Sequence, residues 1–186
     1  MLFFNRNHFR ALIAGGGTGS VTVFFGEQLN DTNGEIVYMD FSFTSMKIAQ
    51  RRAKARKLKN IIYVNSWIEG SRFHGLGQFK IVQSSGVLHH LKNPSLGLKI
   101  LKDLSVSNGG MDLMVYAQTG RTAIYMLQNL MRRINSKNNT INDQLQNTNK
   151  TLNGLPKHHW FKINTLVNDH EDGDIGMSCY KYLYLD

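Results

Sequence analysis

The sequence predicts an α/β fold with a doubly wound, mostly parallel sheet and helices on both faces. Short apolar runs alternate with longer segments of helical periodicity, and turn-forming residues separate them. Such alternation favours βαβ units, whose right-handed crossovers give a parallel sheet. The runs are continuously apolar rather than alternating, as in strands that are covered on both sides. A chain of 186 residues has room for one such domain, with a tail.

Each element follows from a local pattern. Five apolar runs bounded by turn formers are expected to be strands, at residues 11–14, 36–39, 61–64, 79–83 and 111–117. Apolar residues at helical spacing predict helices over 21–29, 42–58, 94–104 and 121–134. Ser42 or Thr44 can cap the second helix, and Asn93-Pro94 fits an N-cap followed by the first helical residue. Asn108-Gly109-Gly110 is expected to be a turn.

The pattern stops after residue 134. Asn, Thr, Gln and Lys dominate residues 135–153 with little to bury, which predicts a long mobile loop. Residues 160–167 and 177–185 are expected to be strands. The expected organisation is a ligand-binding core over 1–134, an Asn-rich loop over 135–154, and C-terminal strands within 155–186 that complete or cap the sheet.

The chain is basic, with 22 Lys and Arg against 13 Asp and Glu. This charge permits contact with nucleic acid, acidic lipid or an anionic substrate without selecting among them. Seven of the cations lie between Lys47 and Lys59 with no acid among them. They could bind phosphates, but the aromatic residues of a single-strand platform are missing. We therefore expect a solvated helix face and no nucleic-acid substrate.

Other features exclude several classes of protein. The single cysteine, Cys179, cannot form an internal disulfide, which favours a reducing, cytoplasmic location. The longest uncharged run, residues 11–26, is shorter than the ~20 residues of a membrane-spanning helix, so no membrane association is expected. The acidic and histidine residues near the C-terminus do not have zinc-ligand spacing, and no metal site is expected.

The most informative stretch is the glycine loop after the first expected strand. Its spacing is Gly15-x-Gly17-x-Gly19, which differs from the dinucleotide fingerprint and from the phosphate loop that ends in Gly-Lys. Asp40 ends the second strand, where an acidic side chain can accept hydrogen bonds from both hydroxyls of a ribose. The alternative is an ordinary strand–helix turn, with Asp40 capping the next helix.

The segments ALIAGGGTGS, IVYMDFS, FKIVQSSGVLHHLKNP and SNGGMDLMVYA resemble successive motifs of class I S-adenosylmethionine-dependent methyltransferases. The resemblance covers residues 10–118 and implies a Rossmann-like sheet, with S-adenosylmethionine across the carboxyl ends of the central strands. It implies roles for these residues: Gly15, Gly16, Gly17 and Gly19 approach the amino-acid portion, Asp40 holds the ribose, Phe41 lies against the adenine, Ser66 and Trp67 touch the adenine edge, and Ser84 and Ser85 line the methyl-donor side.

Three positions depart from the family pattern. Ile13 and Trp67 stand where the family often has acidic residues, and Phe79-Lys80 replaces Phe-Asp. Each loss would weaken cofactor binding by about 1.5–3 kcal/mol, the value of a hydrogen bond to a charged group. Trp67 can instead stack on the adenine or be a core aromatic. The resemblance also implies a fold that is incomplete at both ends, with a lid supplied by a partner chain or a parent-chain segment.

The acceptor is not identified by any motif. His89 and His90 are candidates for a base or for a group that orients the acceptor; the alternative is that one packs and the other is solvated. Ser84-Ser85-Gly86-Val87 stands where enzymes acting on base or glutamine amines carry Asn/Asp-Pro-Pro-Tyr, so a small-molecule acceptor is expected. The alternatives are a catalytically impaired or truncated cofactor-binding protein that acts through a partner, an NAD-dependent oxidoreductase, which the glycine spacing disfavours, and a nucleic-acid-binding module.

Overall fold

The computed structural model describes residues 9–73, 75–135 and 140–163. The chain folds into two compact units, Met1–Val115 and Tyr116–Asp186. In the part of the chain that is described, no helix is long and apolar enough to cross a membrane.

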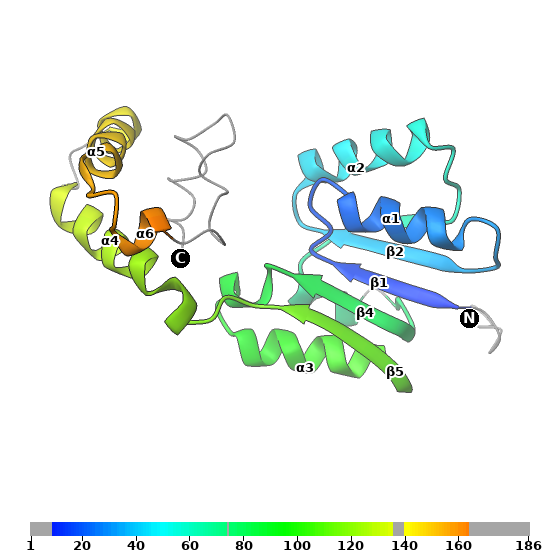
Figure 1. Ribbon diagram of the computed structural model, residues 1–186. Helices are drawn as coiled ribbons and strands as arrows, with labels where there is room; N and C mark the ends of the chain where they lie inside the picture. Colours follow the sequence, from blue (N-terminus) through cyan, green and yellow to red (C-terminus); the bar gives the residue numbers. More distant parts are fainter. Residues whose placement is uncertain (1–8, 74, 136–139, 164–186) are drawn as a thin grey trace. The chain divides into compact units, whose positions relative to one another are not determined.

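The first unit is a five-stranded parallel sheet in the order β3-β2-β1-β4-β5. Helices α1 and α2 cover one face and α3 covers the other (Figure 1). This arrangement confirms the predicted doubly wound α/β fold. The elements are β1 (Arg10–Ala14), α1 (Ser20–Leu29), β2 (Glu35–Asp40), α2 (Phe43–Ala55), β3 (Ile61–Asn65), η1 (Ile68–Phe73), β4 (Phe79–Ser85), η2 (Leu88–His90), α3 (Pro94–Leu104) and β5 (Ser105–Met114).

Strand β1 lies at the centre of the sheet. Leu12 pairs with Val37 of β2 on one side and with Val82 of β4 on the other. All three side chains are almost fully buried, as are their neighbours on β1. The continuous apolar run therefore forms a strand because helices cover both of its faces. The chain order also reverses between β1 and β4, and such a switch point forms a crevice at the carboxyl ends of the strands.

Both predicted helix caps are confirmed. The Ser42 hydroxyl accepts a hydrogen bond from the Ser45 amide at 3.2 Å and begins α2. The Asn93 side chain accepts one from the Leu96 amide at 3.0 Å, with Pro94 as the first residue of α3. These bonds satisfy amides that the helix itself leaves without partners.

The predicted turn at Asn108-Gly109-Gly110 is wrong. These residues lie inside β5, at a register shift where Phe79 pairs with Ser105 and Ile81 with Gly110. Extra residues on one strand of a pair produce such an irregularity. A Cβ on Gly109 would lie 2.9 Å from the Lys80 carbonyl oxygen, so a glycine permits the close approach of the two backbones.

The second unit contains η3 (Thr119–Arg121), α4 (Thr122–Ile134), α5 (Ile141–Gly154) and α6 (Trp160–Ile163). The predicted helix at α4 is confirmed, although it packs in this unit rather than in the core expected over 1–134. Its apolar face forms a small core with the helices that follow. That core consists of Ala123, Ile124, Leu127, Met131, Leu152 and Phe161, with Leu155 packed against it.

Two predictions for this unit are wrong. The expected mobile loop over 135–154 is a helix from Ile141 to Gly154. It begins with a capping box, in which Thr140 accepts from the Asp143 amide and Asp143 accepts from the Thr140 amide. The strand expected over 160–167 is helical at Trp160–Ile163. Residues 164–167 and the strand expected over 177–185 lie outside the described residues.

Candidate functional site

The five parallel strands of the first unit end at one edge of the sheet, and the glycine loop crosses this edge. The loop follows β1, and the amides of Gly15 and Gly16 donate to the Met39 carbonyl at 2.8 and 3.1 Å. These bonds lead the chain from the end of β1 over the end of β2. The residues that the resemblance implicated in ligand binding therefore meet at the carboxyl edge of a parallel sheet, where ligands of such folds bind.

Asp40 connects the glycine loop to α2. Its side chain is 8% exposed, at the last position of β2. Oδ2 accepts from the Gly17 amide and Oδ1 from the Ser42 amide, both at 2.8 Å. Each carboxylate oxygen can accept a second hydrogen bond. The carboxylate is thus fixed in position and can still accept hydrogen bonds from a ligand. A residue that only caps the next helix would not also bond the Gly17 amide.

Gly17 and Gly19 need glycine for different reasons. Both have left-handed backbone angles, with φ of 51° and 87°. A Cβ on Gly17 would meet no atom within 4 Å, whereas a Cβ on Gly19 would lie 2.5 Å from the Cβ of Ala49. Gly19 therefore allows α1 and α2 to pack closely. Gly17 leaves open space beside its backbone, next to the Asp40 carboxylate.

Tyr38 also holds the glycine loop, through the carbonyl group of Gly17. Its hydroxyl donates to the Gly17 carbonyl at 2.7 Å. Burial raises the pKa of Tyr38, and the Asp40 carboxylate and Tyr63 raise it further. The phenol therefore stays protonated and remains a donor. Gly17 is bonded through its amide to Asp40 and through its carbonyl to Tyr38, two residues apart on one strand.

Phe41 and Trp67 form an exposed aromatic pair beside Asp40. Their rings are 15° from parallel with centroids 6.2 Å apart, and the side chains are 69% and 66% exposed. This exposure excludes the interpretation of Trp67 as a core aromatic. The Asn65 amide group fixes the segment by donating to the carbonyls of Asp40 and Phe41 at 2.8 and 2.9 Å. Buried Ser66 donates its backbone amide to the Asp40 carbonyl at 3.1 Å.

The end of β4 adds polar groups to this edge. Ser84 is fully buried, and its hydroxyl has no hydrogen-bond partner among the described residues. Ser85 follows it and is exposed. The Gly86 amide donates to the Met114 carbonyl at 3.0 Å and joins the end of β4 to β5. An unpartnered buried hydroxyl is costly, which marks Ser84 as a position where a bound ligand can supply a partner.

His89 and His90 lie in η2, shortly after β4. Their ring centroids are 4.2 Å apart at an angle of 58°. His89 is half-buried and His90 is exposed. Val87, just before η2, packs against the glycine loop, since a Cβ on Gly15 would overlap with its Cγ2. The structure thus brings the histidine pair to the same edge as the loop, and their role stays a prediction.

Arg52 contacts the glycine loop, which the sequence does not predict. From α2, its Nη1 donates to the Thr18 carbonyl at 3.1 Å, to the Thr18 hydroxyl at 3.2 Å and to the Ser20 hydroxyl at 3.1 Å. Sequence pattern groups Arg52 with the solvated basic face. The available signal is its spacing, because it follows Ala49 by three residues and so lies on the helix face that meets the loop. None of the described residues forms a group of His, Cys, Asp or Glu that could hold a metal ion.

Comparison with known proteins gives a consistent result. The sequence profile of a family described as "Methyltransferase domain" matches residues 12–111. An uncharacterized protein of Synechococcus sp. is 32% identical over 119 residues, which are 64% of this chain and 28% of that protein. The chain therefore spans less than a third of the length of this relative.

Several solved structures share the fold. PKMT2 from Rickettsia typhi, in complex with AdoHcy, matches 96% of this chain and 35% of its own, with a TM-score of 0.65 at 16% identity. YcgJ from Bacillus subtilis matches 68% and 53%, with a TM-score of 0.53 at 18% identity. The DszA carbon methyltransferase matches 59% and 29%, with a TM-score of 0.51 at 24% identity.

Proposed function

This chain belongs to the methyltransferase domain family, and from that premise we propose that it binds S-adenosylmethionine and transfers its methyl group to an acceptor. The observation that carries the proposal is the fixed Asp40 carboxylate beside the open backbone of Gly17. The activity of the whole protein is also part of the proposal, because this chain covers only 28% of the length of its Synechococcus relative.

Asp40 would hold the ribose. Its two oxygens each accept one backbone amide at 2.8 Å, and the remaining lone pairs suit the 2′ and 3′ hydroxyls. A carboxylate in this position favours a free 2′ hydroxyl over a 2′-phosphate, which it would repel. Because the side chain is 8% exposed, its hydrogen bonds to a ligand would form with little competition from water.

The loop glycines Gly15, Gly16, Gly17 and Gly19 would adjoin the amino-acid portion of the cofactor. Gly17 supports this role because no atom lies where its side chain would be. A ligand can therefore approach the main chain more closely than any Cβ would allow. Ile13 is 1% exposed within β1 and offers no charge to the cofactor ammonium. Backbone carbonyl groups would therefore have to accept the hydrogen bonds of the ammonium.

The exposed aromatic pair would hold the adenine. Phe41 follows Asp40 directly, and Trp67 lies at a centroid distance of 6.2 Å from it. Both rings present faces on which a purine can stack. Ser66 adjoins Trp67 at the same edge. Trp67 thus offers stacking in place of the hydrogen bond that an acidic side chain gives in much of the family.

The methyl-donor side would adjoin the end of β4. The buried Ser84 hydroxyl, which has no partner among the described residues, fits a polar group of a ligand there. Ser85 is exposed beside it. S-adenosylmethionine bound here would supply a methyl group that an acceptor's lone pair displaces from sulfur, with the electron pair of the broken bond staying on sulfur. The chain's task is to position the acceptor and exclude water.

His89 and His90 are the proposed groups for orienting the acceptor or taking its proton. Their place in η2 beside Val87 supports this role, because Val87 touches the glycine loop. We propose a small-molecule acceptor, as the absence of the Asn/Asp-Pro-Pro-Tyr motif favours. A second candidate is a protein that binds the cofactor without turnover and acts through a partner, which the apolar Ile13 favours.

Calorimetry tests the proposal with S-adenosylmethionine, S-adenosylhomocysteine and NAD. We expect both sulfur compounds to bind at least ten times more tightly than NAD. Tighter binding of NAD would overturn the proposal. Transfer of labelled methyl groups to a panel of small amines, hydroxyls and carbon acids then separates the two candidate functions. A protein that binds the cofactor without turnover would transfer no label to any of them.

A matched pair of glycine variants locates the ligand. Gly17 and Gly75 have similar backbone angles, with φ of 51° and 57°, and neither has an atom within 4 Å of a built Cβ. Gly17→Ala and Gly75→Ala should therefore cost the fold the same amount, about 1 kcal/mol each. Only Gly17→Ala should abolish cofactor binding. Equal cofactor affinity in the two variants would show that the loop does not adjoin the ligand.

A further inference from the structure

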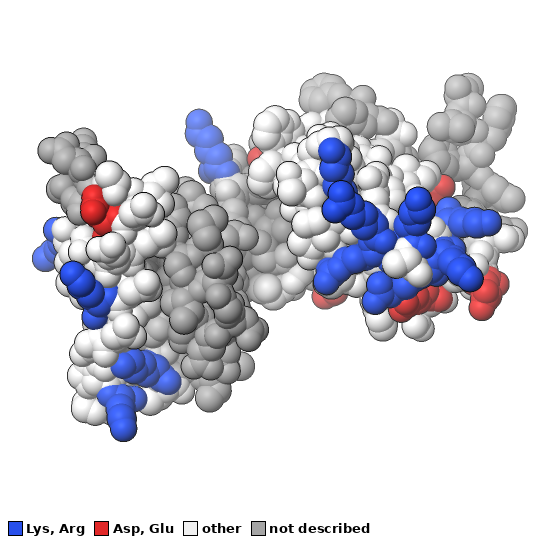
Figure 2. Space-filling view, turned by 90° about the horizontal axis from the view of Figure 1, so that it is seen from above, with Lys and Arg blue, Asp and Glu red and all other residues white. Residues whose placement is uncertain are grey.

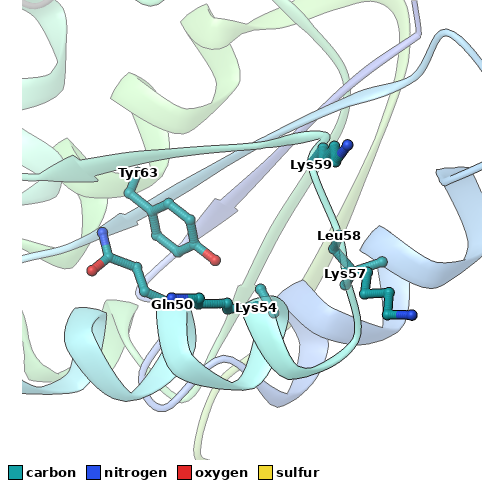
Figure 3. A pocket seen from close by; sticks show the side chains of 7 residues that line it. Gln50, Lys54, Lys57, Leu58, Lys59 and Tyr63 are labelled. Carbon is teal, nitrogen blue, oxygen red and sulfur yellow. The ribbon is translucent and has the colours of Figure 1, made fainter.

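An open pocket lies between the end of α2 and β3, and Lys57 and Lys59 of its lining precede β3, at the opposite ends of the strands from the glycine loop. It has a volume of about 330 Å³. Its lining combines three lysines with an aromatic ring and an apolar wall (Figure 3). The lining residues are Gln50, Ala53, Lys54, Lys57, Leu58, Lys59 and Tyr63. We call it the α2–β3 pocket.

The pocket lies in the most basic part of the chain. No acidic residue occurs between Asp40 and Glu69 in the sequence. Lys and Arg side chains gather over this part of the first unit (Figure 2). A region with charges of one sign attracts anions and concentrates them near the surface.

Six of the seven cations of this region fall into two groups, and Arg51 belongs to neither. Three are used within the unit: Arg52 binds the glycine loop, Arg56 pairs with Glu27 at 3.0 Å, and Lys47 lies 4.5 Å from the centre of the Phe43 ring. The three pocket lysines have no ion-pair partner among the described residues and are exposed. The residues that line the pocket therefore carry ammonium groups that are not neutralised.

Lys57 occupies a backbone conformation that favours glycine. Its φ is 58°, the only positive value of a non-glycine residue in the described part of the chain. It follows Arg56, the C-cap of α2, with its amide donating to the Lys54 carbonyl and the Leu58 amide donating to the Ala53 carbonyl. Helices usually end with glycine at this position because other side chains strain it. The strain at Lys57 is consistent with a use for its side chain.

Tyr63 provides a second observation, independent of charge. Its hydroxyl is buried in the wall of the pocket and has no hydrogen-bond partner among the described residues. Its ring packs against Tyr38 at a centroid distance of 5.3 Å, which holds it in place. Burial raises the pKa of Tyr63, so the hydroxyl stays protonated as a donor. A ligand that accepts a hydrogen bond would satisfy it.

We propose that the α2–β3 pocket binds a nucleotide, with its phosphate on the lysines and its base against Leu58 and Tyr63. Lysine ammonium groups suit phosphate oxygens, and the apolar wall suits a flat base. This second site is separate from the proposed cofactor site and independent of the proposed function, because the lysines precede β3 while the glycine loop lies at the strands' other ends.

The nucleotide can be free or part of an RNA strand, and two probes separate these sources. The full chain is titrated with fluorescent UMP and with a labelled single-stranded U10 RNA, in saturating S-adenosylhomocysteine. Binding of UMP supports a free ligand, and binding of U10 alone supports a strand. Binding of neither at low salt would overturn the proposal. So would weaker binding in saturating S-adenosylhomocysteine than in a titration without it, or binding to vesicles of anionic lipid without binding to either probe.

Variants test the residues. Lys57→Gly relieves the backbone conformation and removes the ammonium group, so the melting temperature should stay the same or rise while affinity falls about tenfold. Replacing Lys54, Lys57 and Lys59 together by Gln should lower the salt-dependence slope for U10 by about 2, at about 0.7 per lost phosphate contact. The matched control replaces Lys92, Lys99 and Lys102 by Gln. Equal losses in the two triple variants would overturn the proposal, because binding would then follow net charge alone.

Discussion

Arg52 and Thr18 are joined by two hydrogen bonds from one guanidinium nitrogen. Nη1 of Arg52 lies 3.1 Å from the Thr18 carbonyl oxygen and 3.2 Å from its hydroxyl. A side chain of α2 thus holds the tip of the glycine loop, 34 residues away in the sequence. The loop's shape depends on this contact as well as on its own glycines.

Arg52→Ala should weaken cofactor binding. The bonds are charge-assisted but solvent-exposed, so we expect a loss of about 1 kcal/mol, or roughly fivefold in affinity. Calorimetry with S-adenosylhomocysteine measures it. Arg51→Ala removes the same charge from the adjacent position and is the control. An equal loss in both variants would mean that long-range charge, and not the contact with the loop, sets the affinity.

Gly19→Ala should destabilise the fold rather than act on the ligand alone. Its Cβ would lie 2.5 Å from the Ala49 Cβ and 2.8 Å from the Ala49 Cα. Overpacking together with the left-handed backbone should cost about 3 kcal/mol of the free energy of unfolding. Urea unfolding measures it.

Ala49→Gly in the same chain should restore part of the stability lost in Gly19→Ala, since one of the two clashing atoms is gone. A double-mutant cycle gives the interaction between the positions. Strict additivity would contradict the packing argument.

Tyr38→Phe should make stability depend less on alkaline pH. The raised pKa of Tyr38 means that its contribution is complete below the unfolded value near 10 and is lost as pH rises above it. Near pH 8 the variant lacks the bond to the Gly17 carbonyl and should be less stable by about 1 kcal/mol. Urea unfolding from pH 8 to 11 should show the two stabilities converging, whereas a constant difference would refute the assignment to Tyr38 ionisation.

Thr140→Ala should unfold the first turn of α5. Hydrogen bonds from Thr140 lower the pKa of Asp143, so the capping box is present above that pKa and lost as pH falls through it. Hydrogen exchange at the amides of residues 142–146 should speed up in the variant. Thr151→Ala removes only an interior hydroxyl bond to the Asn147 carbonyl and should leave these amides protected. Equal exchange in both variants would rule out the cap.

Much of the first unit could be predicted because local pattern and tertiary structure agree there. Residues 11–14 are apolar because they form the central strand, and Ser42 and Asn93 cap helices as their types predict. Asp40 is identifiable from its place at a strand end. These features need only neighbours in the sequence or the general geometry of parallel sheets.

The features that could not be predicted share a different cause. Arg52 acts through a contact between a helix and a distant loop that no sequence window contains. Residues 108–110 have the composition of a turn, but pairing with β4 accommodates them inside a strand. Helix α5 is hidden because Asn is a poor helix former, although Thr140-x-x-Asp143 is a readable start signal. Trp67 can be assigned only once its exposure is known.

The double attachment of Gly17 has a thermodynamic consequence. Its peptide groups are tied to Asp40 and Tyr38 of a buried strand before any ligand arrives. The conformational entropy of this stretch of loop is therefore lost when the protein folds, and little more is lost when a ligand binds. Ligand capture should then proceed in a single kinetic phase whose rate rises linearly with concentration, with no slow rearrangement after the encounter.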